Sequence, residues 1–243
     1  MADAAKSEKP KRQPPIRDAS TLVIVRQRAD GPEVLMGERS SGHVFYPHHY
    51  VFPGGRVDRA DGYVTPARPL RPEVMARLTA SADARRAQAL ALAAVRETFE
   101  EAGLVIGAQA DAPKRAPKGW DPFYATGYGP ALDRLTYIYR AVTPPGRPRR
   151  FNARFFAAEY DAVAHVADVD EDELLKLHWR DLDSALELGC SLKFSLPLSL
   201  TPLLCHQNNP KSWPKPQMIS FFPSPFTSTM ILIGLKVTQG FPA

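Results

Sequence analysis

The sequence is poor in cysteine and has no long apolar run. It holds two cysteines, Cys190 and Cys205, in 243 residues. So few cysteines, both near the C-terminus, exclude a disulfide-built domain and remove any need for an oxidising compartment. No apolar stretch reaches the roughly 18 residues that a membrane span needs, and the N-terminus lacks the apolar core of a secretory signal. We therefore expect a cytoplasmic protein with no membrane partner.

Acidic residues are missing from the C-terminal end. Residues 188–243 carry four lysines and no Asp or Glu, and residues 1–17 carry five basic against two acidic residues. The region between them, 18–187, has 22 basic and 24 acidic residues. The net charge of +5 therefore comes from the two ends, and the central region lacks the basic face of a nucleic-acid-binding domain. We do not expect a nucleic-acid partner, although binding through the basic tails is an alternative.

The composition divides the chain into three parts. Residues 1–17 are rich in Lys, Pro and Ala and predict a disordered basic tail. Residues 18–187 are long enough to form one globular domain with its own core. Residues 188–243 hold eight of the 24 prolines and no acids, which predicts a poorly ordered tail without a catalytic residue.

The central feature of the sequence is a predicted helix with three acids on one face. The run from about residue 84 to 102 is rich in strong helix formers, and Gly103 follows where a left-handed residue ends a helix. Like charges at spacings i, i+3 and i+4 repel by roughly 0.2–0.5 kcal/mol per pair, and a cation such as Mg²⁺ with oxygen ligands offsets this. The alternative is a solvated acidic surface. The acids are Glu97, Glu100 and Glu101, opposite a predicted core face of Leu92, Val95, Phe99 and Ala102.

A glycine turn upstream favours the metal interpretation. Phe52-Pro53-Gly54-Gly55 predicts a strand followed by a tight turn, where backbone can approach a ligand closely. Together with Arg96-Glu97-Thr98-Phe99-Glu100-Glu101-Ala102-Gly103-Leu104, this turn resembles the signature of the Nudix hydrolases, G-x5-E-x7-R-E-U-x-E-E-x-G-U, where U is a bulky apolar residue. Thr98 departs from that pattern at an apolar position.

The spacing departs from the signature as well. Gly55 matches its first glycine and Asp61 stands in for its first glutamate, but a long insertion, about 61–83, separates Asp61 from Arg96. This split form resembles the branch that includes peroxisomal coenzyme A diphosphatases and bacterial relatives. The insertion is either a lid over the diphosphate or an appended helix.

The resemblance implies a fold and a chemistry. The fold is α+β, an α/β/α sandwich with a mixed sheet. The reaction is hydrolysis of a phosphoanhydride in a nucleoside diphosphate joined to another group, such as coenzyme A or acyl-CoA, with ADP-ribose and dinucleotides as competing substrates. Mg²⁺ or Mn²⁺ is held by the three acids beside the Gly54 carbonyl. Glu100 or Glu101 doubles as general base, and Arg96 holds an acid in place.

Further candidates lie outside the signature. Residues 21–26 and 33–39 predict a hairpin, and Arg39 at its end is a candidate substrate contact. Arginines around the predicted strand 151–157 form a candidate anion clamp, because guanidinium binds phosphate in bidentate fashion; Arg150 and Arg154 are favoured. Glu171 and Glu173, in a late acidic run, are candidates for an extra metal ligand or base.

The sequence leaves open whether the fold is catalytic and how many copies of the chain associate. A Nudix fold used only as an inactive ligand sensor is an alternative function, against which the intact acids argue. The sequence does not fix the oligomeric state, and a homodimer is compatible with it.

Overall fold

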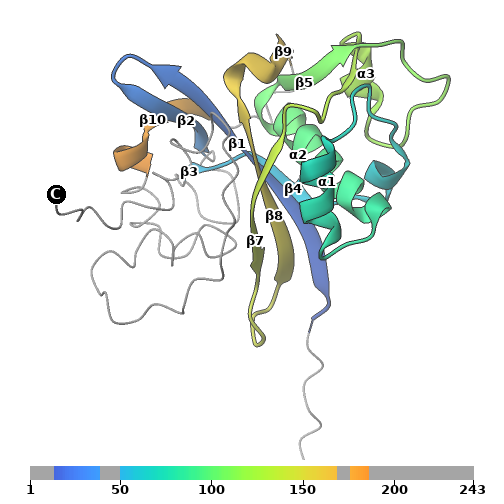
Figure 1. The fold of residues 1–243 in the computed structure, drawn as a ribbon, viewed down its shortest axis with the longest axis horizontal. Coiled ribbons are helices and arrows are strands. Elements are labelled where there is room, and N and C mark those ends of the chain that lie inside the picture. Colours follow the sequence, from blue (N-terminus) through green and yellow to red (C-terminus); the bar gives the residue numbers. More distant parts are fainter. Residues whose placement is uncertain (1–13, 39–49, 169–175, 186–243) are drawn as a thin grey trace, which may run out of the picture.

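A mixed sheet forms the body of the protein (Figure 1). The structure, a computed structural model, describes residues 14–38, 50–168 and 176–185. Strands β10, β2, β1, β8 and β7 are neighbours in that order, with β3 paired to β2 and β4 paired to β1. The strands are β1 Ile16–Arg28, β2 Gly31–Glu38, β3 Tyr50–Val51, β4 Gly54–Arg56, β7 Thr136–Val142, β8 Arg150–Glu159 and β10 Lys176–Asp181.

The longest strand, β1, organises this sheet. It pairs antiparallel with β2 and β4 and parallel with β8, which brings two segments far apart in the sequence side by side. The predicted hairpin is confirmed. However, β1 begins at Ile16, inside the stretch predicted to be disordered, because the backbone pairing with β8 already starts at Ile16 and Arg150. Residues 1–13 of the predicted N-terminal tail and the whole predicted C-terminal tail, 188–243, lie outside the described residues.

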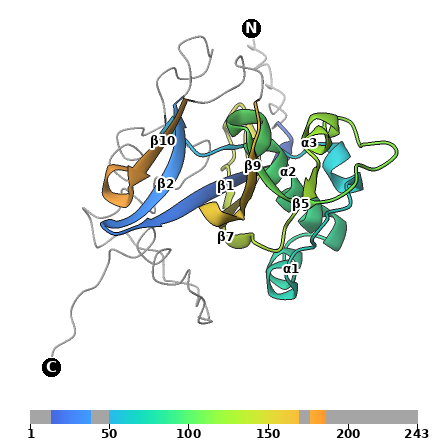
Figure 2. The same ribbon diagram turned by 90° about the horizontal axis from the view of Figure 1, so that it is seen from above.

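Helices α1 (Pro72–Thr79) and α2 (Ala84–Ala102) lie together on one side of the large sheet (Figure 2). A smaller sheet of β6, β5 and β9 and the short helix α3 lie beside them. These elements are β5 Leu104–Gln109, α3 Asp121–Ala125, β6 Tyr128–Pro130 and β9 Val163–Val166. The mixed α+β architecture predicted from the sequence is confirmed. None of the helices in the described ranges combines the length and apolar character needed to cross a bilayer.

The insertion is part of the core. It consists of the 3₁₀ turn η1 (Arg59–Tyr63), an extended segment and α1. Val74 and Leu78 of α1 are buried in the main core cluster with α2, and Arg71 donates to the carbonyl of Asp133. Of the two predicted alternatives, the structure shows an appended helix.

The segment between β5 and β7, which contains α3 and β6, also packs inward. Trp120 and Phe123 are fully buried, and the Phe123 ring lies 5.3 Å from that of Phe99 on α2. Another 3₁₀ turn, η2 (Tyr160–Ala162), joins β8 to β9. Contacts from α1 and from the segment that holds Phe123 therefore fix the position of α2 and the direction of its acidic end.

Candidate active site

Helix α2 carries the candidate site in its last turns. Asp83 caps it by accepting a hydrogen bond from the Arg86 N–H, and Gly103 ends it with φ 67°, the left-handed region that glycine adopts without a Cβ clash. Both predicted ends are confirmed. Its predicted core face is buried, so its acids are directed toward β4 and η1.

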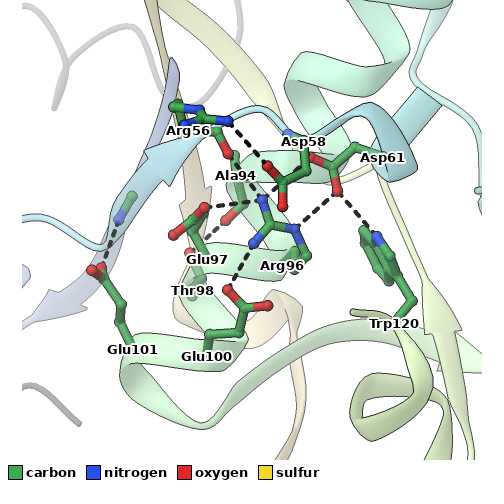
Figure 3. A network of polar contacts seen from close by, with 11 residues as sticks. Arg56, Asp58, Asp61, Ala94, Arg96, Glu97, Thr98, Glu100, Glu101 and Trp120 are labelled. Atoms are coloured by element: carbon green, nitrogen blue, oxygen red, sulfur yellow. Dashed lines mark hydrogen bonds and ion pairs between the residues drawn. The ribbon is translucent and has the colours of Figure 1, made fainter. Parts of the chain in front are cut away.

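Arg96 is the centre of a buried polar network (Figure 3). Its Nη1 donates to Glu100 Oε2 at 2.7 Å and its Nη2 to Glu97 Oε1 at 2.9 Å. Its Nε donates to Asp61 Oδ1 at 2.9 Å, and Nη2 also reaches the Arg56 carbonyl at 3.0 Å. The structure thus shows Arg96 holding Glu100, as the i, i+4 spacing predicts, and holding two further acids as well.

Asp61 anchors this network from the η1 turn. Its side chain is completely buried, and it accepts hydrogen bonds from Arg96, from the indole N–H of Trp120 at 3.0 Å and from the Asp58 N–H at 2.8 Å. The residue that replaces the signature's first glutamate therefore fixes Arg96. Sequence reasoning missed the part played by Trp120; the available signal was that a buried indole N–H needs an acceptor.

Glu97 is packed against the glycine turn. Its side chain is only 15% exposed, so it does not project into solvent as the helix face alone predicts. A Cβ at Gly55 would overlap its carboxylate, with 2.5 Å to Cδ. Glycine at this position is what allows the carboxylate to lie against the backbone of β4.

We expect Gly55→Ala to displace Glu97 and to reduce turnover at least about tenfold, while lowering the free energy of unfolding by about 1–3 kcal/mol, the usual cost of overpacking. Steady-state kinetics and urea denaturation measure the two effects. Gly62→Ala is the matched control, because its added Cβ would come no closer than 3.3 Å to the flexible Arg85 side chain and 3.9 Å to Ala89 Cβ. Equal turnover in both variants would contradict the assigned position of Glu97.

Glu101 faces the same turn. Its Oε2 accepts a hydrogen bond from the Gly54 N–H at 2.9 Å, so the structure brings Gly54 to the acids.

Thr98, the departure from the signature, is buried and donates its hydroxyl to the Ala94 carbonyl at 2.8 Å, which satisfies it within the helix.

The electrostatics of the cluster are unbalanced toward negative charge. Burial raises the pKa of Glu97 to about 7; Arg96 opposes this increase, and the charges of Glu101 and Glu100 add to it. For Arg96, burial favours the neutral form, but the Asp61 hydrogen bond and the charges of Glu97, Asp61 and Glu100 raise its pKa above the ordinary value.

The donors fit a hard divalent cation. Three carboxylates of one helix turn offer the oxygen ligands that Mg²⁺ and Mn²⁺ prefer, and a cation relieves the repulsion from Glu101 and Glu100 that adds to the effect of burial on the Glu97 pKa. In the part of the chain that the structure describes, no three His, Cys, Asp or Glu side chains are already gathered as a metal cage. Glu97 and Glu100 are instead drawn to Arg96, and Glu101 to Gly54, so these side chains must turn to share one ion.

The raised pKa of Glu97 predicts that the stability of the protein depends on pH. The folded-state pKa of Glu97 is above its unfolded value, so its contribution to stability is present at low pH and lost as the pH rises through about 7. A metal ion on the ionised carboxylate opposes this loss. We therefore expect 5 mM MgCl₂ (about the range that saturates a millimolar site) to raise Tm more at pH 8 than at pH 6. Glu97→Gln is the control and should lose the difference; an equal rise at both pH values in the natural protein would contradict the expectation.

The other predicted site residues are not gathered here. Arg150 begins β8 and donates to the Thr143 carbonyl, beside the β7–β8 turn. Arg154 is fully buried and donates to Asn152 and Ser81 rather than to an acid of the cluster, and its predicted contact with the substrate stays a prediction. The burial follows from its position on the helix-covered face of β8. Arg39, Glu171 and Glu173 lie outside the described residues.

Comparison with known proteins supports the resemblance. No family model matches the chain. The putative Nudix hydrolase 7 of Caenorhabditis elegans is 26% identical over 208 residues, covering 81% of this chain and 62% of that protein, so the match spans less than two thirds of the relative. The crystal structure of a Nudix hydrolase from Alicyclobacillus acidocaldarius is 28% identical with a TM-score of 0.55, covering 73% of this chain and 84% of the other. The fold and these two likenesses support placing the chain in the Nudix hydrolase superfamily.

Proposed function

We propose that this protein hydrolyses a phosphoanhydride bond in a nucleoside diphosphate joined to another group, with Mg²⁺ or Mn²⁺ as cofactor. The observation that carries the proposal is the packing of Glu97 and Glu101 against the Gly54-Gly55 turn, next to Glu100, which shares the buried partner Arg96 with Glu97. This arrangement supports a role in binding metal and diphosphate better than the alternative of a solvated acidic surface, because Glu97 is mostly buried.

The residues of the chain have separate tasks in this reaction. Glu97, Glu100 and Glu101 would hold the ion beside the Gly54 backbone, and the bound ion supplies charge neutralisation of the diphosphate and a lowered pKa of the attacking water. Glu100 or Glu101 accepts the proton of that water as general base. Arg96 is a positioning residue, since its guanidinium orients Glu97 and Glu100 while Asp61 holds the guanidinium itself.

The proposed substrate class is coenzyme A or its acyl derivatives. This finer proposal comes from the split signature, in which the insertion separates Asp61 from Arg96. ADP-ribose and dinucleoside polyphosphates are the competing substrates. Arg39 and Arg150 as phosphate contacts, and Glu171 or Glu173 as a further base or ligand, stay predictions.

Product analysis tests this function. The full chain is incubated with coenzyme A, ADP-ribose and a dinucleoside polyphosphate, each with Mg²⁺, with Mn²⁺ and with a chelator. We expect cleavage of one substrate class at its phosphoanhydride and none with the chelator. Saturable substrate binding by the folded protein without turnover would instead favour the ligand-sensor alternative.

A further inference from the structure

A second polar cluster lies at the open end of the face of the sheet that α1 and α2 cover. Register places Asp18 of β1 beside Asn152 of β8, and Arg154 of β8 beside Arg140 of β7. Further along the same strands, Leu22 and Phe156 are fully buried in the main core. The covered face is therefore apolar along most of its length and strongly basic at this end.

Two guanidinium groups in this cluster share one neutral acceptor. The side-chain oxygen of Asn152 accepts from Arg140 Nε at 2.8 Å and from Arg154 Nη1 at 2.6 Å. Arg154 also donates from Nη2 to Ser81 Oγ at 2.9 Å. Among the described residues, neither arginine forms an ion pair with a carboxylate. Buried charges are normally paired, and here the buried guanidinium of Arg154 is linked to the exposed Arg140 through an amide.

The nearby carboxylate is already engaged. Asp18 forms a bidentate pair with Arg86, at 2.5 and 2.6 Å, and also accepts from the Asn152 amide at 3.0 Å. The direct contacts of Asp18 with a cation therefore go to Arg86, and its charge acts on Arg154 without a hydrogen bond.

Arg154 itself is short of partners. The residue has no exposed surface, and within the described part of the molecule its Nε has no hydrogen-bond partner. Burial and the charge of Arg140 both lower its pKa. A buried donor without an acceptor is costly, by about 1–3 kcal/mol and more when charged, so an acceptor at this donor would stabilise the cluster, and a negatively charged acceptor would do so most strongly.

The rim of the cluster is open and basic as well. Arg140 is exposed, and so is Arg77 on α1, whose guanidinium lies 5.2 Å from the centre of the Tyr137 ring. The Arg77 guanidinium therefore lies close to Tyr137, which precedes Arg140 by three positions on β7.

We propose that Arg140 and Arg154, with Arg77 at the rim, form an anion site for a phosphate group, separate from the acidic cluster of α2. Arg154 and Asn152 form its buried floor, and Arg140 and Arg77 face the solvent from which the anion enters. A phosphate group suits the site because its several oxygens accept from more than one guanidinium at once.

Calorimetric titration of inorganic phosphate into the full chain tests the site. A chelator is present so that no metal at the α2 acids contributes, and KCl keeps the ionic strength constant. We expect saturable binding that Arg140→Gln weakens at least about tenfold, the loss of one charge-assisted contact. Arg154→Gln should abolish it. Arg147→Gln, an exposed arginine near the tip of the same hairpin, removes the same charge and should bind as the natural protein does.

The outcomes decide the proposal directly. No saturable phosphate binding by the natural protein would overturn the proposal, and so would unchanged binding by the Arg140→Gln variant. Because Arg140 is exposed, a loss of binding in this variant is not explained by a failure to fold. A second titration with adenosine 3′-monophosphate separates two sources of the same chemistry. Tighter binding than that of inorganic phosphate assigns the site to a nucleotide phosphate, and equal or weaker binding assigns it to free phosphate.

Discussion

Replacement of Arg96 by glutamine is expected to lower the free energy of unfolding by about 3–5 kcal/mol, because removing one partner of a buried ion pair leaves the other charge uncompensated. The side chain of Arg96 is 7% exposed and that of Asp61 is fully buried. Water therefore cannot replace the lost guanidinium. Glutamine cannot reach Asp61, Glu97 and Glu100 together, so the acids lose both charge balance and position.

Urea denaturation at pH 7.5 measures this effect. Arg134→Gln is the control, because Arg134 pairs with Asp161 at 2.6 Å on the surface, where such pairs contribute about 0–1 kcal/mol. Adding Asp61→Asn to the Arg96 variant should recover part of the loss, since it removes the stranded charge. A free energy of unfolding for Arg96→Gln within about 1 kcal/mol of the natural protein would contradict the role assigned to this network.

Replacement of Glu100 or Glu101 by glutamine is expected to reduce kcat/KM about a hundredfold or more, the size of effect seen when one preorganised electrostatic group is removed from an active site. Glutamine keeps the shape of the side chain but loses the charge that holds a divalent ion. Folding should survive. Arg96 keeps its bonds to Asp61 and Glu97 in the Glu100 variant, and the glutamine oxygen can still accept from the Gly54 N–H in the Glu101 variant.

Kinetics at saturating and limiting Mg²⁺ separate the two variants' effects on metal affinity from those on turnover. Glu73→Gln is the matched control, because Glu73 is an exposed acid on α1 paired only with the neighbouring Arg71 in the described structure. Its kcat/KM should equal that of the natural protein. Natural activity in both the Glu100 and the Glu101 variants would remove these acids from the reaction.

Local signals made part of this site predictable. Helix propensity and the glycine stop predicted the bounds of α2, and the spacing of its acids predicted their common turn. The contact between Arg96 and Glu100 followed from i, i+4 geometry alone. These features depend on residues close together in the sequence, so a pattern is enough to find them.

The long-range contacts were not predictable in the same way. Asp61 lies 35 positions before Arg96, and the hydrogen bond that Asp61 accepts from the Trp120 indole joins residues that no local pattern relates. The partial burial of Glu97 depends on how closely β4 approaches α2, which a helical wheel does not contain. The side of the sheet that Arg154 occupies was not predictable either, because it depends on long-range packing: its hydrogen bond to Ser81, between α1 and α2, places it on the helix-covered face.

The most direct test of the central claim is hydrolysis in ¹⁸O-labelled water followed by mass spectrometry of the products. The full chain is incubated with the substrate class selected by product analysis, with Mg²⁺ or with a chelator. The proposed mechanism predicts one ¹⁸O atom in a phosphate-containing product, incorporated only when the metal ion is present and lost in the Glu101→Gln variant. Labelled product in the presence of the chelator, or no product from a folded natural protein with Mg²⁺ and every substrate of the panel, would contradict metal-dependent hydrolysis at Glu97, Glu100 and Glu101.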